Sequence, residues 1–452
     1  MVHLQKTCRI VTSCIVSAGL ALVAADGPVS DETAGAPTVG NASEEPSRLS
    51  VLPSWLKLGA EFRARVELTR HVDFEPRSQD TYYLSRLRFE VGVQPSSWLR
   101  LHLQGQDASA PAFNDRSALE GIANALDVRQ AYAEFGGGET GPWALRAGRQ
   151  ELSFGDERLV GADNYWDALG QTFDALRLTY AKPSFRLDWF GAFLLPPRHG
   201  RLDRAATGNQ LYGFYSSFAN GPGGAVVEPY FLWKSSRRLL DEAGRSGHHD
   251  VYTWGVRAEG DLPRRFDYNV ELALQRGHVL RDSIAAWAGH WEIGYKLREP
   301  EDAPRVALEY NFGSGDGDPE DGHRRTFDEL YPAGYNGFGM SDPFAWMNSH
   351  NLSGYAEWKV SRRWQLSLGY RGFWLATLRD GLYLDPETWL ARDPGAPSSH
   401  VGNQVSFLAT HEFSKRWQLH FGYARFFPGS YLKHSSYDGA LSTPFVMWNY
   451  RF

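Results

Sequence analysis

Acidic, basic and aromatic side chains gather in residues 153–171, a polar stretch that contains three glycines. The stretch carries Asp156, Glu157, Arg158, Asp163, Tyr165, Trp166 and Asp167. Carboxylates near an arginine and aromatic rings can act as general acids and bases, or they can hold a charged ligand. Which role applies depends on what the flanking segments, 143–152 and 172–180, belong to, because both alternate apolar and polar residues.

Histidines are the other candidates for acid–base chemistry, and four of them stand in alternating segments: His102, His290, His411 and His420. A hydrolase needs a nucleophile, a base and an orienting carboxylate that converge at one place. The sequence contains no G-x-S-x-G motif, and an isolated His is more often a polar structural group than a base. We therefore predict no catalytic residue and keep a hydrolase as the less favoured alternative.

An acidic run, residues 316–322, is the one candidate for metal binding that the sequence pattern suggests. Calcium requires several oxygen ligands on a tight loop. The run lacks the spacing of the twelve-residue helical calcium loop, and Pro319 interrupts it. We expect a solvated acidic external loop, leave calcium binding open, and predict no metal site and no cofactor.

The composition is polar on average and rich in aromatic residues. The mean hydropathy is −0.43, and aromatic residues make up 14% of the 452 residues, with 16 Trp. Beyond residue 25 no apolar run approaches the ~20 residues that a membrane helix needs. This balance is typical of a closed transmembrane β-barrel with aromatic girdles and a wet interior. The net charge of −6, without a basic run, gives no sign of nucleic-acid binding.

The N-terminus has the features of a secretory signal. Lys6 and Arg9 precede an apolar run, 10–23, which ends in small residues up to position 25. A lipoprotein site at Cys14 is the alternative, but Arg9 leaves almost no apolar run before it. The domain prediction is a signal peptide at 1–25, a disordered periplasmic lead-in at 26–52 and an outer-membrane β-barrel at 53–452. The mature chain then lacks cysteine, which excludes disulfides and thiolate chemistry.

From Trp55 onward, apolar and polar residues alternate at period two in segment after segment. Such alternation needs one dry and one wet face and does not fit a helix. Eighteen segments show it: 56–69, 81–94, 98–107, 127–135, 143–152, 172–181, 184–194, 209–218, 225–234, 251–260, 265–277, 285–297, 304–313, 348–360, 363–376, 401–413, 416–427 and 444–452. The connections alternate short and long, and the long ones have about 10 to 34 residues.

The alternation of short and long connections favours an outer-membrane barrel over a soluble sandwich, because such barrels have short periplasmic turns and long extracellular loops. Four short turns are followed at once by tryptophan: Trp98, Trp143, Trp364 and Trp417. Tryptophan is favoured at the membrane interface, so these positions match a periplasmic girdle. The predicted fold class is an all-β, 18-stranded antiparallel transmembrane β-barrel in the cell outer membrane.

If the apolar residues face lipid, many arginines face the lumen. The early strands contribute Arg63, Arg65, Arg86, Arg88 and Arg100, and later strands add Arg177, Arg257, Arg305 and Arg371. Guanidinium groups stay charged and bind carboxylates bidentately, so such a lining would attract a polyanion. The alternative is that each arginine pairs with a lumen carboxylate such as Glu61, Glu90 or Glu259 and holds the barrel open.

Two assignments do not follow the alternation. Arg146 and Arg149 are three residues apart, so they cannot share a face unless a bulge lies between them. Arg129 lies in a weakly alternating segment, between Val128 and Tyr132.

Several motifs together resemble the alginate-export family of outer-membrane porins. They are Gly148-Arg149-Gln150-Glu151-Leu152, Gly155-Asp156-Glu157-Arg158-Leu159-Val160-Gly161, Phe173-Asp174 with Arg177, residues 61–67, Gly315-Asp316 with residues 326–332, and Phe426-Phe427-Pro428-Gly429. The resemblance implies an 18-stranded monomeric barrel whose arginine-rich conduit passes an anionic polyuronate outward. The motifs carry over Arg63, Arg65, Arg149, Arg158 and Asp174. This chain has Gln171-Thr172 before Phe173-Asp174, where the family pattern tends to place an arginine, which bears on the substrate more than on the fold.

The predicted function is an outer-membrane pore that conducts an alginate-like polyuronate, or its oligomers, by passive facilitated diffusion. The predicted conduit residues are Arg63, Arg65, Arg86, Arg88, Arg100, Arg129, Arg149, Arg158, Arg177 and Asp174. The expected partners are the anionic polysaccharide and the lipid bilayer, with a periplasmic export complex as a candidate and no nucleic acid. A general anion-selective uptake porin is the alternative, and an outer-membrane hydrolase is less favoured.

For the polar stretch itself, the sequence predicts a loop that joins the fifth and sixth strands and folds in part into the lumen. We expect it to place Arg158 with Asp163 or Asp167 at a constriction.

Overall fold

The structure, a computed structural model, describes residues 52–75, 78–111, 119–221, 224–240, 246–298, 303–334, 340 and 343–452. The predicted signal peptide and lead-in lie outside the described residues, apart from Leu52. The described residues all belong to one compact unit, 36–452.

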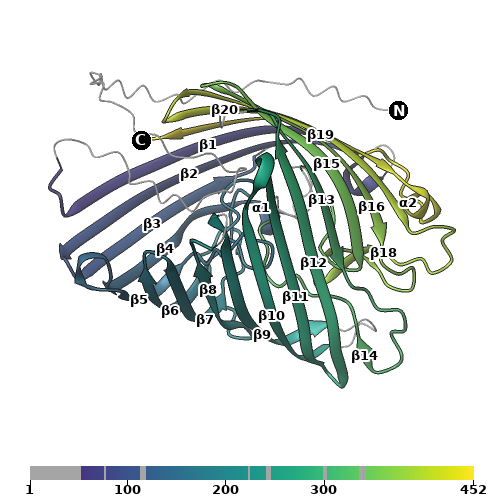
Figure 1. Cartoon of the computed structure of the whole chain (residues 1–452), viewed down its shortest axis with the longest axis horizontal. Coiled ribbons are helices and arrows are strands. Elements are labelled where there is room, and N and C mark those ends of the chain that lie inside the picture. Colours follow the sequence, from purple (N-terminus) through teal and green to yellow (C-terminus); the bar gives the residue numbers. More distant parts are fainter. Residues whose placement is uncertain are drawn as a thin grey trace, which may run out of the picture. The chain divides into compact units, whose positions relative to one another are not determined.

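Eighteen strands of the described residues form a closed antiparallel barrel (Figure 1). They are β1 (Leu56–Arg70), β2 (Gln79–Ser96), β3 (Leu99–Ser109), β4 (Asn124–Gly136), β5 (Trp143–Gln150), β6 (Phe173–Lys182), β7 (Phe185–Leu194), β8 (Asn209–Phe218), β9 (Val226–Leu240), β10 (Ser246–Leu262), β11 (Phe266–Val279), β12 (Asp282–Lys296), β13 (Arg305–Gly313), β15 (Ser349–Ser361), β16 (Trp364–Leu375), β19 (His400–Ser414), β20 (Trp417–Pro428) and β21 (Ser442–Arg451). Each pairs with its neighbours along the chain, and β1 also pairs with β21, with Val66 opposite Val446. All eighteen predicted segments match these strands.

Shorter elements lie in the connections. They are η1 (Val72–Phe74), α1 (Leu119–Ile122), η3 (Gly138–Thr140), η5 (Pro263–Arg265), β14 (His323–Arg324), a hairpin of β17 (Leu382–Asp385) and β18 (Thr388–Ala391), and α2 (Ser430–His434). The hairpin and β14 were not predicted from the sequence. No helix among the described residues is long and apolar enough to cross a membrane.

Two of the long connections predicted from the sequence are short. β9 ends at Leu240 and β10 begins at Ser246, while β11 and β12 are joined by Leu280 and Arg281 alone. The prediction was wrong there because the pairing continues past the clear alternation: Val279 is paired with Asp282. These four strands therefore reach further on the external side than the sequence pattern indicates.

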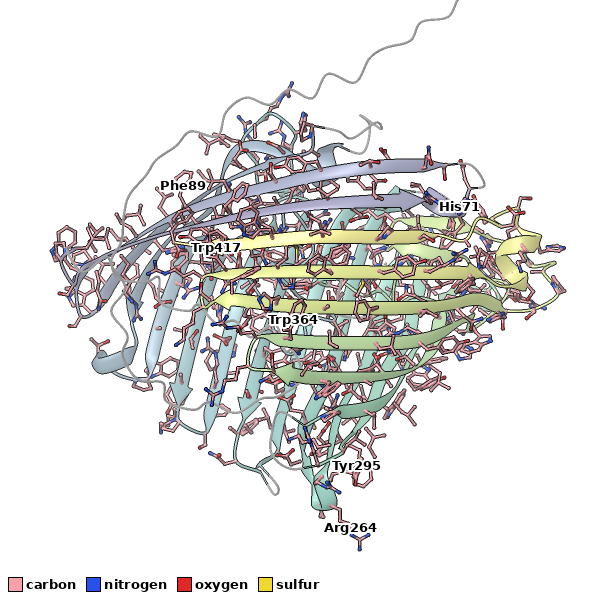
Figure 2. The ribbon with its side chains drawn as sticks, turned by 90° about the horizontal axis from the view of Figure 1, so that it is seen from above. His71, Phe89, Arg264, Tyr295, Trp364 and Trp417 are labelled. Carbon is pink, nitrogen blue, oxygen red and sulfur yellow. The ribbon has the colours of Figure 1, made fainter. Side chains whose placement is uncertain are left out.

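The two faces of the strands differ as predicted. In β13, the side chain of Leu308 is 61% exposed on the outer face, whereas Glu309, the next residue, is 5% exposed on the inner face. The four tryptophans that follow short turns, including Trp364 and Trp417 in Figure 2, are all exposed on the outer surface. An outward apolar surface edged by indoles is what a bilayer-spanning barrel presents to lipid.

The described residues of two long connections fold into the barrel and contribute to its buried apolar cluster. We call residues 151–172, between β5 and β6, loop 3, and residues 314–348, between β13 and β15, loop 7. Leu159 and Val160 of loop 3 and Phe327 and Leu330 of loop 7 are buried in one cluster with inner-face residues. An isolated bridge joins Val160 to Tyr331, so the two loops also bind each other through backbone groups.

Candidate functional site

Loop 3 crosses the lumen and is held by arginines on the inner face of β1, β2 and β4. Arg63 donates to the carbonyl oxygen of Tyr165 at 2.5 Å and also to that of Asp167. Arg86 donates to the carbonyls of Asn164 and Asp167 at 3.1 and 3.2 Å. The prediction that loop 3 folds into the lumen is confirmed.

The remaining contacts on this side converge on one amide and one indole. The Asn164 Oδ1 accepts hydrogen bonds from Arg88 at 2.7 Å and from Arg129 at 3.0 Å. Arg65 donates to the carbonyl of Trp166 at 2.7 Å, and its guanidinium lies 4.0 Å from the centre of the Trp166 ring. We call Arg63, Arg65, Arg86, Arg88 and Arg129 the arginine wall; all five are less than 10% exposed.

Nearby carboxylates offset part of the charge of the arginine wall. The ion pairs are Arg86–Glu61 at 2.5 Å, Arg65–Glu67 at 3.4 Å and Arg129–Glu151 at 2.8 Å. Loop 3 also brings Asp163 close, but burial, and then the neighbouring Asp167, raise the pKa of that carboxyl. Carbonyl and amide acceptors carry no net charge, so the wall combines five guanidiniums with fewer compensating anions.

Arg158 binds a different part of the lumen from the one predicted. It contacts His290 Nε2 at 2.9 Å, Asp156 at 3.5 Å and Glu271 at 3.8 Å, on the side formed by β11 and β12. Asp163 accepts instead from the backbone N–H groups of Trp166 and Gly334. The predicted pairing of Arg158 with Asp163 or Asp167 was wrong, because the oxygens of both aspartates are engaged by backbone amides.

The side of the lumen opposite the arginine wall is rich in carboxylates. Arg257 of β10 lies 2.6 Å from Asp156, 2.7 Å from Glu228 and 2.6 Å from Glu259. Burial raises the pKa of Asp156, but Arg158 and Arg257 outweigh it and lower the value to about 2. The arginines here thus have more acidic partners than those of the arginine wall, since Arg257 alone contacts three carboxylates.

Three predicted conduit residues, and one outside the prediction, can be placed by register. Arg100 and Arg177 face the lumen and pair with Glu134 at 2.5 Å and Asp188 at 2.8 Å. Arg129 also faces the lumen, and a register shift in the β3–β4 pairing explains its irregular position. Arg146 faces inward with Glu134, at 2.6 Å.

Arg149 and Asp174 lie on the outer face of the sheet and do not line the lumen. They are opposite each other in the β5–β6 pairing and form an ion pair at 3.1 Å. Asp174 is two residues before Leu176 and therefore faces the same side of the sheet. Leu176 is 59% exposed on the outer face, while Ala175 between them is buried. Strand alternation therefore separates Arg146 from Arg149 without a bulge.

Loops 3 and 7 enclose a cavity of about 40 Å³. It is lined by Arg158, Asn311, Glu329, Pro332, Ala333, Gly334, Phe344, Ala345, Trp346 and Leu384. Burial raises the pKa of Glu329 to about 8, and its carboxyl group accepts a hydrogen bond from the backbone N–H of Trp346 at 2.6 Å. The volume fits a few water molecules, so the two loops pack closely at this level.

The acidic run 316–322 is solvated as expected at Asp318, Glu320 and Asp321, which are exposed, but not at Asp316. Asp316 is fully buried and accepts backbone N–H groups from Asp318 and Arg325. Asp321 is exposed and pairs with the Arg325 side chain at 2.8 Å. Its carboxylates thus stabilise the fold of loop 7 itself.

Histidines of the lumen are engaged in polar contacts with strand residues. His290 is completely buried between Arg158 and Asn311, and His420 contacts Thr410 and Asn449. Sequence reasoning missed Asn164 and Glu151 as central contacts. Nothing in their local sequence marks them, since their partners are 13 to 76 residues away.

Comparison with known proteins supports the same fold. The solved structures of OpdR from Pseudomonas aeruginosa (TM-score 0.59, 12% identity, covering 88% of this chain and 96% of that one) and of OccAB4 from Acinetobacter baumannii (0.59, 8%, 88% and 98%) are similar. OpdK from Pseudomonas aeruginosa, solved with vanillate, is similar too (0.60, 11%, 88% and 98%). At 8–12% identity, these likenesses show the barrel fold alone. The curated proteins gave no match.

A family profile described as alginate export matches residues 54–439, which is most of the 452-residue chain. The match covers the barrel strands from β1 to β20 and both inserted loops, and the family indicates a channel rather than an enzyme. The chain therefore belongs to the alginate-export family and forms a β-barrel pore of the outer membrane.

Proposed function

We propose that this pore passes an anionic polysaccharide, an alginate-like polyuronate or its oligomers, across the outer membrane by passive facilitated diffusion. The observation that carries the proposal is the arginine wall. Its guanidiniums donate to backbone carbonyls and to one amide of loop 3, which leaves positive charge on that side of the lumen. A polyuronate carries one carboxylate on each sugar, so successive sugars can bind successive arginines.

Loop 3 occupies the positions that such a substrate would use. Carboxylates form stronger hydrogen bonds with guanidinium than neutral carbonyls do. An entering uronate can therefore replace the carbonyls of Asn164, Tyr165 and Asp167 on Arg63 and Arg86. In this mechanism the substrate itself displaces the loop, and the loop returns when the substrate has passed.

The carboxylate-rich side makes the charge of the lumen differ from one side to the other. Asp156, Glu228 and Glu259 surround Arg257 and repel an anionic chain from β9, β10 and β11. Substrate is thereby confined to the arginine wall. Arg100 and Arg177, which face the lumen beside Glu134 and Asp188, belong to the proposed lining, whereas Arg149 and Asp174 on the outer face do not.

Current block in planar bilayers tests the proposal. Oligouronates should reduce the ionic current of the purified protein in a concentration-dependent way, and neutral dextrins of the same length should not. The block should weaken in Arg65→Gln and Arg88→Gln, and persist in Arg371→Gln, because Glu309 already neutralises Arg371 at 2.6 Å. Equal block by both saccharides, or none by oligouronates, would refute it.

A pore for small carboxylates is the second candidate, supported by the fold shared with OpdK, which was solved with vanillate. The same recordings separate the two. If vanillate carries current or blocks it while oligouronates have no effect, the substrate is a small carboxylate and the polyuronate assignment is wrong.

A further inference from the structure

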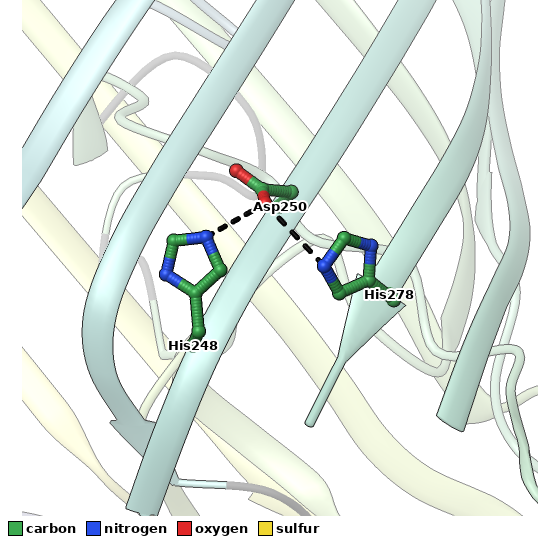
Figure 3. A group of neighbouring side chains, drawn as sticks. All are labelled: His248, Asp250 and His278. Atoms are coloured by element: carbon green, nitrogen blue, oxygen red, sulfur yellow. Dashed lines mark ion pairs between the residues drawn. The ribbon is translucent and has the colours of Figure 1, made fainter. Parts of the chain in front are cut away.

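Two histidines and an aspartate meet on the neighbouring strands β10 and β11 (Figure 3). The Nε2 atoms of His248 and His278 lie 2.8 and 3.4 Å from the same oxygen, Oδ2 of Asp250. One candidate ligand atom from each of the three side chains lies within 4.8 Å of the others. We propose that these residues form a binding site for a divalent transition metal of the zinc class.

Strand register explains why the three side chains share one place. Asp250 of β10 is directly opposite His278 of β11, and opposite residues of an antiparallel pair point to the same face. His248 precedes Asp250 by two residues and so shares that face as well. The face is the outer one, because Trp254, four residues after Asp250, is 47% exposed there.

The position along the strands places the site on the external side. β10 starts at Ser246 and β11 ends at Val279, so all three residues are within the first or last few residues at the external end. His248 and His278 are about half exposed, while the Asp250 carboxylate is 8% exposed. A metal ion from the surrounding solution can therefore reach the histidines without crossing the barrel.

The distances fit a metal with imidazole and carboxylate ligands. Zinc binds nitrogen and oxygen at about 2.0–2.2 Å in a tetrahedral arrangement, which places neighbouring ligand atoms about 3.3 Å apart. The observed 3.4 Å between His278 and Asp250 meets that value, and His248 needs to move outward by a fraction of an ångström. Calcium and magnesium prefer oxygen ligands only, so two imidazoles select a softer ion.

Asp250 is oriented by a group that does not itself bind the metal. The indole N–H of Trp233 in β9 donates to Asp250 Oδ1 at 2.9 Å, which leaves Oδ2 facing both histidines. Carboxylate ligands in metal sites are commonly held by such outer hydrogen bonds. Arg276, the charged residue two positions before His278, is exposed and donates to the Gln275 carbonyl of its own strand at 2.7 Å.

The bound ion would join β10 to β11 at the external end of the strands. Three protein ligands leave the fourth position of a tetrahedral ion open to water or to an oxygen ligand from outside. The site involves no residue of the arginine wall, so its presence or absence is independent of the proposed transport function.

Zinc titration of the tag-free protein in detergent, after removal of metals with a chelator, tests the site. We expect one equivalent of Zn²⁺ to bind. His248→Ala and His278→Ala should each lower the affinity by on the order of 100-fold or more, and Trp233→Phe by about 10-fold, because outer-shell losses cost 10- to 100-fold. His434→Ala is the matched control, since His434 forms a single exposed pair with Asp393 at 2.6 Å. The Zn²⁺ affinity of this variant should equal that of the wild type.

A second measurement needs no variant. The X-ray absorption spectrum of the zinc-loaded wild-type protein should show two imidazole ligands together with oxygen at tetrahedral distances. Absence of stoichiometric binding, a spectrum with fewer than two imidazoles, or an equal loss of affinity in His434→Ala would overturn the proposal. The three side chains would then be a cluster of ion pairs only.

Discussion

Asn164→Ala should loosen loop 3 from the arginine wall. The Asn164 amide links two arginines of the barrel to the start of loop 3: Oδ1 accepts from Arg88 and Arg129, and Nδ2 donates to Glu151, the first residue of the loop, at 2.9 Å. Alanine removes all three bonds without adding a charge, and it leaves the carbonyl bonds to Arg63 and Arg86 in place. The barrel strands themselves are unchanged.

The magnitude follows from the bonds that are lost. A hydrogen bond to a charged group contributes about 1.5–3 kcal/mol, and two guanidiniums share the lost acceptor. Both keep other partners, Gln106 for Arg88 and Glu151 for Arg129. We therefore expect a net loss of about 2–3 kcal/mol, which lowers the ratio of docked to undocked loop by roughly 30- to 150-fold.

Single-channel recording in planar bilayers measures this change. Asn164→Ala should show more frequent and longer transitions to the larger conductance, because the undocked loop no longer crosses the lumen. The control is Asn209→Ala, in which Asn209 at the start of β8 bonds Ser236 of β9 and not loop 3. Identical current fluctuations in Asn164→Ala and wild type would show that the arginine wall does not hold the loop.

Two further predictions concern stability. Burial raises the pKa of Glu329 from 4.5 to about 8, so the protonated carboxyl contributes fully to the free energy of unfolding below pH 4.5. That contribution falls by up to about 1.4 kcal/mol per pH unit as the pH rises and is lost above pH 8. In denaturant titrations at several pH values, the free energy of unfolding of Glu329→Gln should depend less on pH than that of the wild type, and an equal pH dependence would contradict the assignment. Leu308 is 61% exposed in the middle of β13, and Leu308→Arg should lower the free energy of unfolding in lipid vesicles by about 2–4 kcal/mol. Leu68→Arg, near the external end of β1, should lower it by about 1 kcal/mol or less. Equal losses in the two variants would argue against Leu308 facing the bilayer centre.

The barrel could be predicted because each strand has one lipid face and one wet face, and this leaves a period of two in the sequence. The predicted ends of strands were less accurate where the alternation of apolar and polar residues stops before the strand pairing stops. Val279 and Asp282 continue the β11–β12 pairing through residues without a clear pattern, so a two-residue turn was mistaken for a longer connection. Motif resemblance also misplaced Arg149 and Asp174 in the conduit, although strand parity separates Arg146 from Arg149.

The contacts of loop 3 could not be predicted in the same way. Its main acceptors are backbone carbonyls, which every residue has, so the sequence contains no sign that those of Tyr165 and Asp167 meet Arg63. Arg158 illustrates a second limit. Asp163 is close in sequence, but its oxygens accept backbone amides, and the partner of Arg158 in β11, Glu271, is more than a hundred residues away.

We propose that the arginine wall makes this pore selective for anions, and the reversal potential under a KCl gradient measures that selectivity directly. In the wild type the potential should shift toward the chloride equilibrium value. In a triple variant with Arg63→Gln, Arg65→Gln and Arg88→Gln, it should move back toward zero. A wild-type potential near the potassium equilibrium value, or a triple variant indistinguishable from wild type, would show that the arginine wall does not make the pore anion-selective.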